Sequence, residues 1–461
     1  MSPPPATALT SSVRKSGLLR ILGVGFGLAV IFGGTIGVGI LRLPGTVAAK
    51  LGNYWLILLV WIIGGLYALL GSVSVTELGA MLPQAGGFYV YARRAFGAFA
   101  GFAVGWGDWL NNCAVLAYAS ITASEYLAEL FPKARLLRNG TAVALAILMF
   151  FTLLQWMGVR SGSRTQKLTS SVTAMAFLVL VVASFLHSGA VSSSGNSAAP
   201  GHLAVGFFAG AAVLVAALRS VIVTYDGWYE AIYFTEEDVD PAQNLPRIMI
   251  GGVLVIVAMY LLVNLALLHV LSLPQLAASK LPAADAAQLI FGKASGRFIV
   301  VLSLLTLLSL INSVMLGATR IVFAISRDGL FAANVASVSA SGTPRAALLL
   351  TSLAAILLVV TGSFERIIAI AAIFFVANYA ATYLALLVLR RTVPDLPRPF
   401  RAWGYPWTTL TLIAVSLLFL MGAIASDTRN SLYAVSILAA SAPVYLFMTR
   451  RKQMRALPAA Q

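Results

Sequence analysis

The chain has 461 residues, of which 60% are hydrophobic and only 10% are charged, and its mean hydropathy is +0.91. Soluble domains carry roughly 25% charged residues, so this composition argues against a soluble globular protein. The net charge of +16 comes from 31 basic residues spread over many short segments. That spread argues against nucleic-acid binding and favours contact with an anionic membrane surface.

Uncharged stretches long enough to cross a bilayer recur along the whole chain. A helix needs about 20 apolar residues to span the hydrocarbon core, whereas a membrane barrel would show shorter, alternating segments. We therefore expect an all-α integral membrane protein with twelve transmembrane helices, at 21–47, 52–80, 97–129, 139–158, 165–187, 205–235, 247–271, 298–326, 346–361, 366–390, 405–425 and 430–449.

The basic residues indicate how these helices are oriented, because short cytoplasmic loops are enriched in Lys and Arg. If the N-terminus is inside, the inner loops hold most of the 31 basic residues. We therefore expect a multi-pass protein of the cell membrane with both tails, residues 1–20 and 450–461, in the cytoplasm.

The residues that usually carry enzymatic or metal chemistry are scarce. Cys113 is the only cysteine, and the three histidines lack the spacing of metal ligands, so we expect no disulfide and no metal site. The chain also lacks a nucleotide-binding GxxxxGK[ST] loop. These absences argue against a membrane enzyme and against an ATP-driven pump, and we expect no cofactor other than a coupling ion.

The first expected helix contains the stretch GGTIGVG, residues 33–39, in which four of seven residues are glycine. Glycine is the poorest helix former after proline, although glycines in membrane helices also serve close packing. The sixth helix carries a second weak point, Thr224 to Trp228. Transporters built from two inverted five-helix repeats place broken helices at such corresponding positions, so we expect helices 1 and 6 to be unwound.

An unwound segment at this depth is tolerated only where it lines a cavity or is buried in protein. The outer half of the first helix would begin near Gly37, where free N–H groups suit a carboxylate. The outer half of the sixth would end near Val223 to Tyr225, where free carbonyls suit an ammonium group. A site with both groups predicts a zwitterion, which is a free amino acid.

Four motifs, in this order, resemble the amino acid–polyamine–organocation superfamily of transporters, and in particular its bacterial L-type amino acid permeases. They are GTIGVGI at 34–40, ELG at 77–79 with PQAGGFYVY at 83–91, YDGW at 225–228 with the segment to Arg247, and PDLPRPF at 394–400. The resemblance implies the LeuT-like fold and places the protein in a bacterial inner membrane.

This fold implies a first repeat at 21–188, a second inverted repeat at 205–390 and two further helices at 405–449. It implies a permease, acting as an antiporter or symporter, that moves amino acids by alternating access. The substrate carboxylate would meet backbone amides of the first helix, and Tyr225 would be an aromatic gate. The implied substrate-binding residues are Ile36, Gly37, Val38, Gly39, Val223, Thr224, Tyr225, Asp226 and Trp228.

The coupling ion, H⁺ or Na⁺, stays open. Relatives often have a lysine in helix five where this chain has Thr173, so proton coupling through that lysine is in doubt. Asp226 would either cap nearby backbone or couple a proton, and Asp108 would either form a salt bridge or water contact or couple an ion. Ser309 and Ser313 offer hydroxyl oxygens to a sodium ion.

Several polar residues are candidates for the pocket wall, with hydrogen bonding between helices as the alternative. They are Asn111, Asn112, Asn312, Asn378 and Tyr379. Val38 and Ile40 favour a small or apolar amino acid. The alternatives to a transporter of amino acids are a transporter-fold sensor and a cation-coupled transporter of another small amine or organic ion. The oligomeric state stays open.

Overall fold

The computed structural model describes residues 17–187, 207–292, 295–361, 364–426 and 428–456. Their regular structure is helical apart from one isolated bridge between Leu22 and Asp238. The helices are α1 (Val24–Thr35), α2 (Gly39–Leu51), α3 (Tyr54–Met81), α4 (Phe88–Phe96), α5 (Ala98–Leu130), α6 (Gly140–Trp156), α7 (Val159–Leu186), α8 (Phe207–Tyr225), α9 (Pro241–Val270), α10 (Leu273–Ala278), α11 (Pro282–Phe291), α12 (Gly296–Arg327), α13 (Arg345–Thr361), α14 (Phe364–Thr392), α15 (Trp407–Ser426), α16 (Thr428–Ala439) and α17 (Ser441–Ala456), with 3-10 helices η1 (Arg135–Arg138), η2 (Glu230–Phe234) and η4 (Ala333–Ala336).

Seven of the described helices are long and apolar enough to cross a bilayer, and α1 with α2 adds an eighth if the bent pair is one span. Apolar α6 and α13 are shorter, at 17 residues each. The all-helical, multi-span prediction is therefore confirmed in this coarser form.

The short helices α4, α10 and α11 lie outside the expected spans. Both α10 and α11 have a proline among their first residues, and Ser272 forms a capping box with Gln275 at the start of α10. Such caps stabilise helices of one or two turns. Helices this short do not contain an uncharged run long enough to predict a membrane span.

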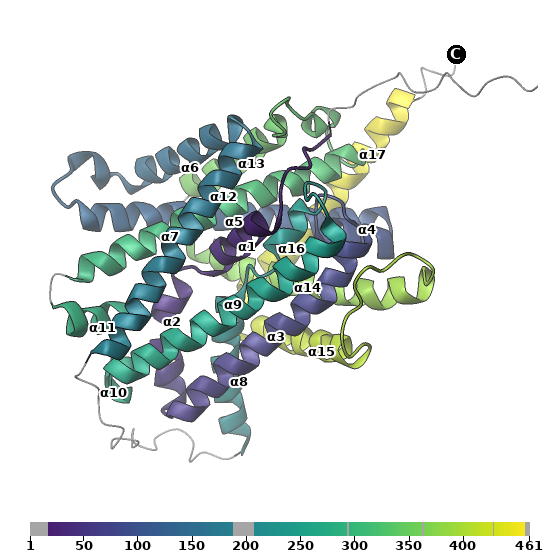
Figure 1. Cartoon of the computed structure of the whole chain (residues 1–461). Coiled ribbons are helices and arrows are strands. Elements are labelled where there is room, and N and C mark those ends of the chain that lie inside the picture. The colour runs from purple at the N-terminus through teal and green to yellow at the C-terminus, as the bar shows by residue number, and fades with distance from the viewer. Residues whose placement is uncertain (1–16, 188–206, 293–294, 362–363, 427, 457–461) are drawn as a thin grey trace, which may run out of the picture.

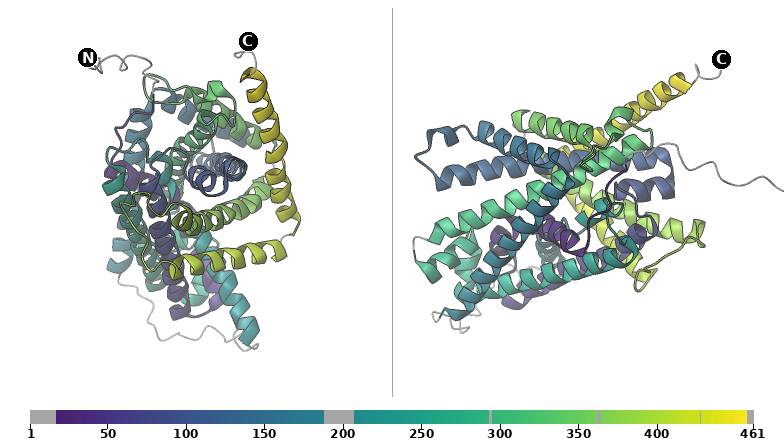
Figure 2. Two further views of the ribbon diagram at one scale, coloured as in Figure 1. Left: turned by 90° about the vertical axis from the view of Figure 1, so that its right-hand side faces the viewer. Right: turned by 45° about the horizontal axis from the view of Figure 1, so that its top comes forward.

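Helix α5 lies near the middle of the bundle, where it packs against α4, α6, α12, α13 and α14. Figure 2 shows it surrounded by the other helices. Three of its polar side chains, Asp108, Asn111 and Asn112, are at most 3% exposed. A buried polar surface at the centre of a membrane bundle is costly unless it has partners, so it marks the region of the site.

One end of the bundle is held by ion pairs between distant segments. The guanidinium of Arg320 on α12 donates to both carboxylate oxygens of Glu237, at 3.0 and 2.9 Å, and both side chains are almost completely buried. Arg327 pairs with Glu236, and Arg390 and Arg398 both pair with Glu77. The first described residues and α17 lie toward this side of the bundle (Figure 1).

Candidate functional site

The first break lies between α1 and α2, which meet at an angle of 45°. Residues 36–38 separate them, and the amide of Gly37 donates to the carbonyl of Thr35. A side chain at Gly33 would collide with Gln166, Ser309 and Ser170, whereas one at Gly37 would meet nothing within 4 Å. Gly33 therefore permits close packing, and Gly37 faces open space.

The second break follows α8, which ends at Tyr225. A turn leads into η2, and Gly227 in that turn has a φ of +101°, a conformation that favours glycine. A Cβ atom at Gly227 would collide with the carbonyl of Gly34. The two breaks therefore touch each other directly, although about 190 residues separate them in the chain.

The hydroxyl of Tyr260 on α9 ties the two breaks together. It lies 2.9 Å from the carbonyl oxygen of Thr35 and 2.9 Å from that of Thr224. These carbonyls belong to the last turns of α1 and α8, where no intrahelical donor is available. The single proton of this hydroxyl can be donated to either carbonyl, so Tyr260 lies within hydrogen-bond distance of both helix ends and links them.

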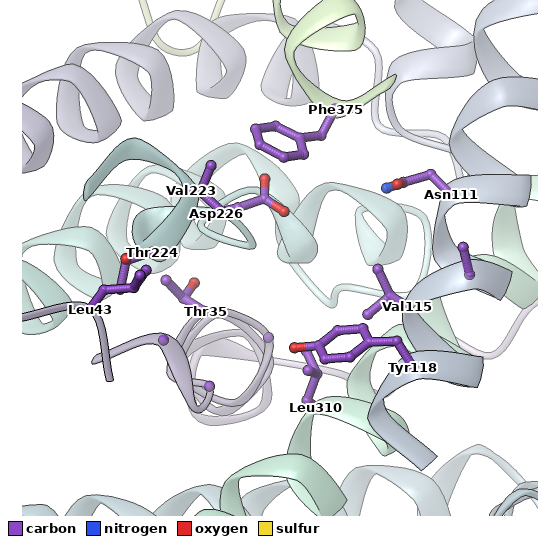
Figure 3. A pocket seen from close by; sticks show the side chains of 14 residues that line it. Thr35, Leu43, Asn111, Val115, Tyr118, Val223, Thr224, Asp226, Leu310 and Phe375 are labelled. Carbon is purple, nitrogen blue, oxygen red and sulfur yellow. The ribbon is translucent and has the colours of Figure 1, made fainter. Parts of the chain in front are cut away.

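A cavity of about 210 Å³ opens where the breaks meet (Figure 3). This is below the roughly 300–1,000 Å³ of sites for drug-sized ligands, and it suits a molecule of a few heavy atoms. The lining residues come from six helices and the two breaks: Gly34, Thr35, Gly37, Gly39, Leu43, Asn111, Ala114, Val115, Tyr118, Val223, Thr224, Asp226, Leu310 and Phe375.

Asp226 is the one acidic side chain among these fourteen residues, and none of the fourteen is basic. The hydroxyl of Tyr379 on α14 donates a hydrogen bond to its carboxylate. Across the cavity, the amides of Gly39 and Ile40 begin α2, ahead of the Leu41 amide that donates to the carbonyl of Val38 at 3.1 Å. They form the positive end of that helix. The cavity thus offers an acceptor for a cation and donors for an anion.

A second cavity, of about 590 Å³, shares Leu43 and Val223 with the first. It is also lined by Lys50 at the end of α2, by Arg219 and Ser220 on α8, and by Gly422 on α15. The second cavity therefore adjoins the central cavity on the side of the bundle opposite the ion pairs.

The structure places five of the nine predicted substrate-binding residues in the wall of the central cavity: Gly37, Gly39, Val223, Thr224 and Asp226. Among the residues considered as pocket lining, Asn111 also lies there. Ile36 is 1% exposed and lies at the break, outside the lining set. The Val38 side chain packs in an apolar cluster with residues of α5, α6, α12 and α13 and lies outside the lining set.

The side chains of Tyr225 and Trp228 also lie away from the cavity lining. The Tyr225 hydroxyl donates to the carbonyl of Trp61 on α3, and its ring packs against Trp61 and Tyr260. Trp228 packs against Tyr229 and Tyr379. In this conformation neither ring covers the cavity, so the gating role assigned to Tyr225 stays a prediction.

Eight of the fourteen lining residues were not among the predicted site residues: Gly34, Thr35, Leu43, Ala114, Val115, Tyr118, Leu310 and Phe375. They include two aromatic side chains, Tyr118 on α5 and Phe375 on α14. Figure 3 shows the Phe375 ring above Asp226, and Tyr118 on the opposite wall next to Leu310. Tyr118 lies seven residues after Asn111, so two turns of α5 place both on one face. That spacing was the available clue, whereas Phe375 lies in an apolar run without a distinguishing pattern.

One of the two hydroxyls proposed for sodium, that of Ser309, is contacted by an amide. The Gln166 side-chain nitrogen lies 3.1 Å from the Ser309 hydroxyl, 3.1 Å from the Ser170 hydroxyl and 3.2 Å from the Ala29 carbonyl of α1. Ser313 donates to the carbonyl of Val30 at 3.3 Å. The Gln166 amide oxygen accepts from Asn312, which belongs to this network and does not line the cavity.

The two remaining candidates for the coupling site, Asp108 and Thr173, differ in their hydrogen bonding. Asp108 accepts hydrogen bonds from Tyr233, at 3.1 and 2.9 Å, and from Asn112 and Asn378, each at 3.3 Å. No described basic side chain forms a salt bridge with it, so that part of the expectation is wrong. The hydroxyl of Thr173 is buried and has no hydrogen-bond partner within the described residues.

Comparison with known proteins supplies independent information. The model of the family described as "Amino acid permease" matches residues 27–446. The serine/threonine exchanger SteT of Bacillus subtilis is 26% identical over 95% of this chain and 99% of its own length. The b(0,+)-type amino acid transporter 1 of Mus musculus is 26% identical over 91% of this chain and 85% of its own length. The large neutral amino acids transporter small subunit 2 of Homo sapiens is 28% identical over 83% of this chain and 72% of its own length.

Proposed function

Because the chain belongs to the amino acid permease family, we propose that it is a secondary transporter that carries free amino acids across a membrane by alternating access. The observation that carries this proposal is the contact between two helix breaks around a cavity with an acidic group on one side and helix-end amides on the other. This polarity matches the two charged groups that all free α-amino acids share.

In the bound state, the substrate carboxylate accepts hydrogen bonds from the first amides of α2, near Gly39. Its ammonium group lies between the Asp226 carboxylate and the carbonyls of Val223 and Thr224. One lone pair of the Thr224 carbonyl faces Tyr260, and the second is free for the substrate. Phe375 and Tyr118 border the space that remains for the side chain.

The proposed architecture has twelve membrane spans. The repeats at 21–188 and 205–390 are inverted, and the breaks lie in their first helices. The first position holds α1 and α2, and the second holds α8 and η2. Breaks at both positions support the assignment of two inverted repeats. Helices at 405–449 complete the bundle, with the tails 1–20 and 450–461 on the cytoplasmic side of a bacterial inner membrane.

With this orientation, the ion-paired end faces the cytoplasm and the cavity lined by Lys50 faces outside. The described conformation is then closed on the inside, since the pairs of Glu236 and Glu237 join the sixth span to α12. Transport requires these pairs to separate so that the central cavity can open inward. A hinge at the glycine-rich breaks would allow that motion.

Counterflow in proteoliposomes tests the proposal. Vesicles loaded with one unlabelled amino acid at high concentration should transiently concentrate the labelled form, and a panel should begin with L-serine and L-threonine. Vesicles without the protein provide the control. Specific binding of an amino acid without counterflow would favour a sensor, and counterflow of amines that lack a carboxylate would favour the alternative substrate class.

A further inference from the structure

Glu230, the first residue of η2, is a buried acidic residue without an assigned role. It lies one turn beyond Asp226, and only 2% of the residue is exposed. Its Oε2 atom has no hydrogen-bond partner among the described residues. Buried polar atoms in membrane proteins nearly always have partners, and unpaired ionisable groups there usually mark functional sites.

Two glycines make the space that holds this side chain. A Cβ atom on Gly34 of α1 would lie 2.6 Å from the Cγ atom of Glu230, and one on Gly317 of α12 would lie 3.2 Å from Oε2. The carboxyl group therefore sits in a slot between the broken first span and α12. In the transport cycle proposed above, these elements separate when the inner side opens, so the slot depends on the transport state.

The charged and titratable groups around Glu230 do not compensate a negative charge. The acidic neighbours are Asp226 and, from α5, Asp108. On α12 the nearest cation along the helix is Arg320, whose guanidinium donates to Glu237 and to the carbonyl of Leu316. On α1, the residue that packs against the Glu230 side chain is Gly34, which carries no charge. The remaining titratable or hydroxyl groups near Glu230 are Tyr229, Tyr233 and Ser313.

The position of Glu230 along the sixth span connects the substrate cavity with the inner face. Asp226 lines the cavity, Glu230 follows by four residues, and Glu237 lies seven residues further on in the closed ion-paired end. A charged carboxylate in this slot would cost several kcal/mol without a partner. A carboxylic acid carries no charge and avoids that cost.

We propose that Glu230 is the proton carrier that couples amino acid uptake to the proton gradient. The proposal rests on the proposed transport function and adds its coupling ion. Glu230 holds a proton while the inner side is closed. When the side opens, its O–H bond breaks, the electron pair stays on the carboxylate, and the proton passes to cytoplasmic water. Protons also fit because the Gln166 amide already contacts the Ser309 hydroxyl and the Ala29 carbonyl, two of the oxygens that a sodium ion would need.

Full-length protein in proteoliposomes provides the test, with labelled L-serine as probe or the amino acid that counterflows fastest. The vesicles contain the pH dye pyranine and no amino acid, and the outside is made acidic. The wild-type protein should accumulate the label above equilibrium, and addition of the amino acid should acidify the lumen. Glu230→Gln, which mimics the protonated form, should keep wild-type counterflow and lose both accumulation and acidification.

The outcomes separate the two proposals. Absence of counterflow by wild type would contradict the transport function itself, whereas counterflow without acidification would overturn only the role of Glu230. Accumulation by Glu230→Gln at the wild-type level would also overturn it. Glu129→Gln, at an exposed position of α5, is the matched control. If Glu230→Gln does not insert stably, Glu230→Asp should still acidify the lumen, and failure to do so while it counterflows would count against the proposal.

Discussion

Gly227 shows how a single residue can join two distant parts of the chain. Its positive φ and its contact with the Gly34 carbonyl both require the absence of a side chain. A neighbouring residue, Asp226, supplies the only acidic group in the cavity lining. Conformation and charge at the second break therefore depend on two adjacent positions, and each can be tested separately.

Replacing Gly227 with alanine should abolish most transport. The new methyl group would add strain of about 1–2 kcal/mol from the left-handed conformation and push the two breaks apart, displacing the binding groups. Because a displacement of about 1 Å can cost about 100-fold in rate, we expect a loss of counterflow of this order. The control is Gly251→Ala on α9, where a Cβ would meet nothing within 4 Å. Equal counterflow by both variants would contradict the proposed contact.

Replacing Asp226 with asparagine should weaken substrate binding. A hydrogen bond to a charged group contributes about 1.5–3 kcal/mol, so we expect the Michaelis constant for counterflow to rise about 10- to 100-fold. Tyr379→Phe removes the hydrogen bond donated to Asp226 and should have a smaller effect. An unchanged Michaelis constant in Asp226→Asn would show that this carboxylate does not bind the ammonium group.

At the scale of elements, the segment from α8 to η2 is held at both ends of its break. Tyr260 from α9 fixes the end of α8 to the end of α1, and the paired carboxylates after η2 connect to α12. The break itself makes few backbone hydrogen bonds, so the surrounding helices determine its shape. Movement of α12 is therefore expected to move the inner half of the sixth span with it.

The ion pair between Arg320 and Glu237 should be essential for stability in the described state. Removing one partner of a buried pair leaves an uncompensated charge and costs about 3–5 kcal/mol, so Arg320→Met should lower the unfolding temperature in detergent markedly. The double variant Arg320→Met with Glu237→Gln removes that charge and should recover much of the loss. A double variant less stable than Arg320→Met would contradict this account.

At the scale of the whole molecule, the distribution of charge separates the two ends of the bundle. The ion pairs gather at one end, and Lys50 and Arg219 line the cavity toward the other. The first described residues and α17 lie toward the ion-paired side (Figure 1). The proposed orientation, with this end in the cytoplasm, makes a direct prediction about labelling.

Cysteine labelling should establish the orientation, because the native Cys113 is buried and should react little. A membrane-impermeant maleimide should label Leu136→Cys, at a position that is 90% exposed, in intact spheroplasts. Ser337→Cys, also at an exposed position, should react only after the membrane is opened. The reverse pattern would invert the proposed topology, and the unmodified protein controls for background.

Local composition was sufficient to predict most of the fold. Long apolar runs must be helices in a bilayer because every backbone group needs a partner, and glycines at 33–39 weaken a helix wherever it lies. The all-helical, multi-span character of the protein therefore followed from residues close together in the chain, whereas the number of twelve spans stays a prediction. The short helices α4, α10 and α11 were not predicted, because they depend on caps and turns and not on a long apolar run.

The direction in which each side chain points required the tertiary arrangement. Tyr225 faces α3 and Phe375 faces the cavity because the helices are rotated by packing against neighbours far away in sequence. The same holds for Gln166 among the predicted sodium ligands and for Glu230 between two glycines. Membrane insertion depends on composition summed along a segment, whereas a binding site depends on which faces meet, and only long-range contacts set those.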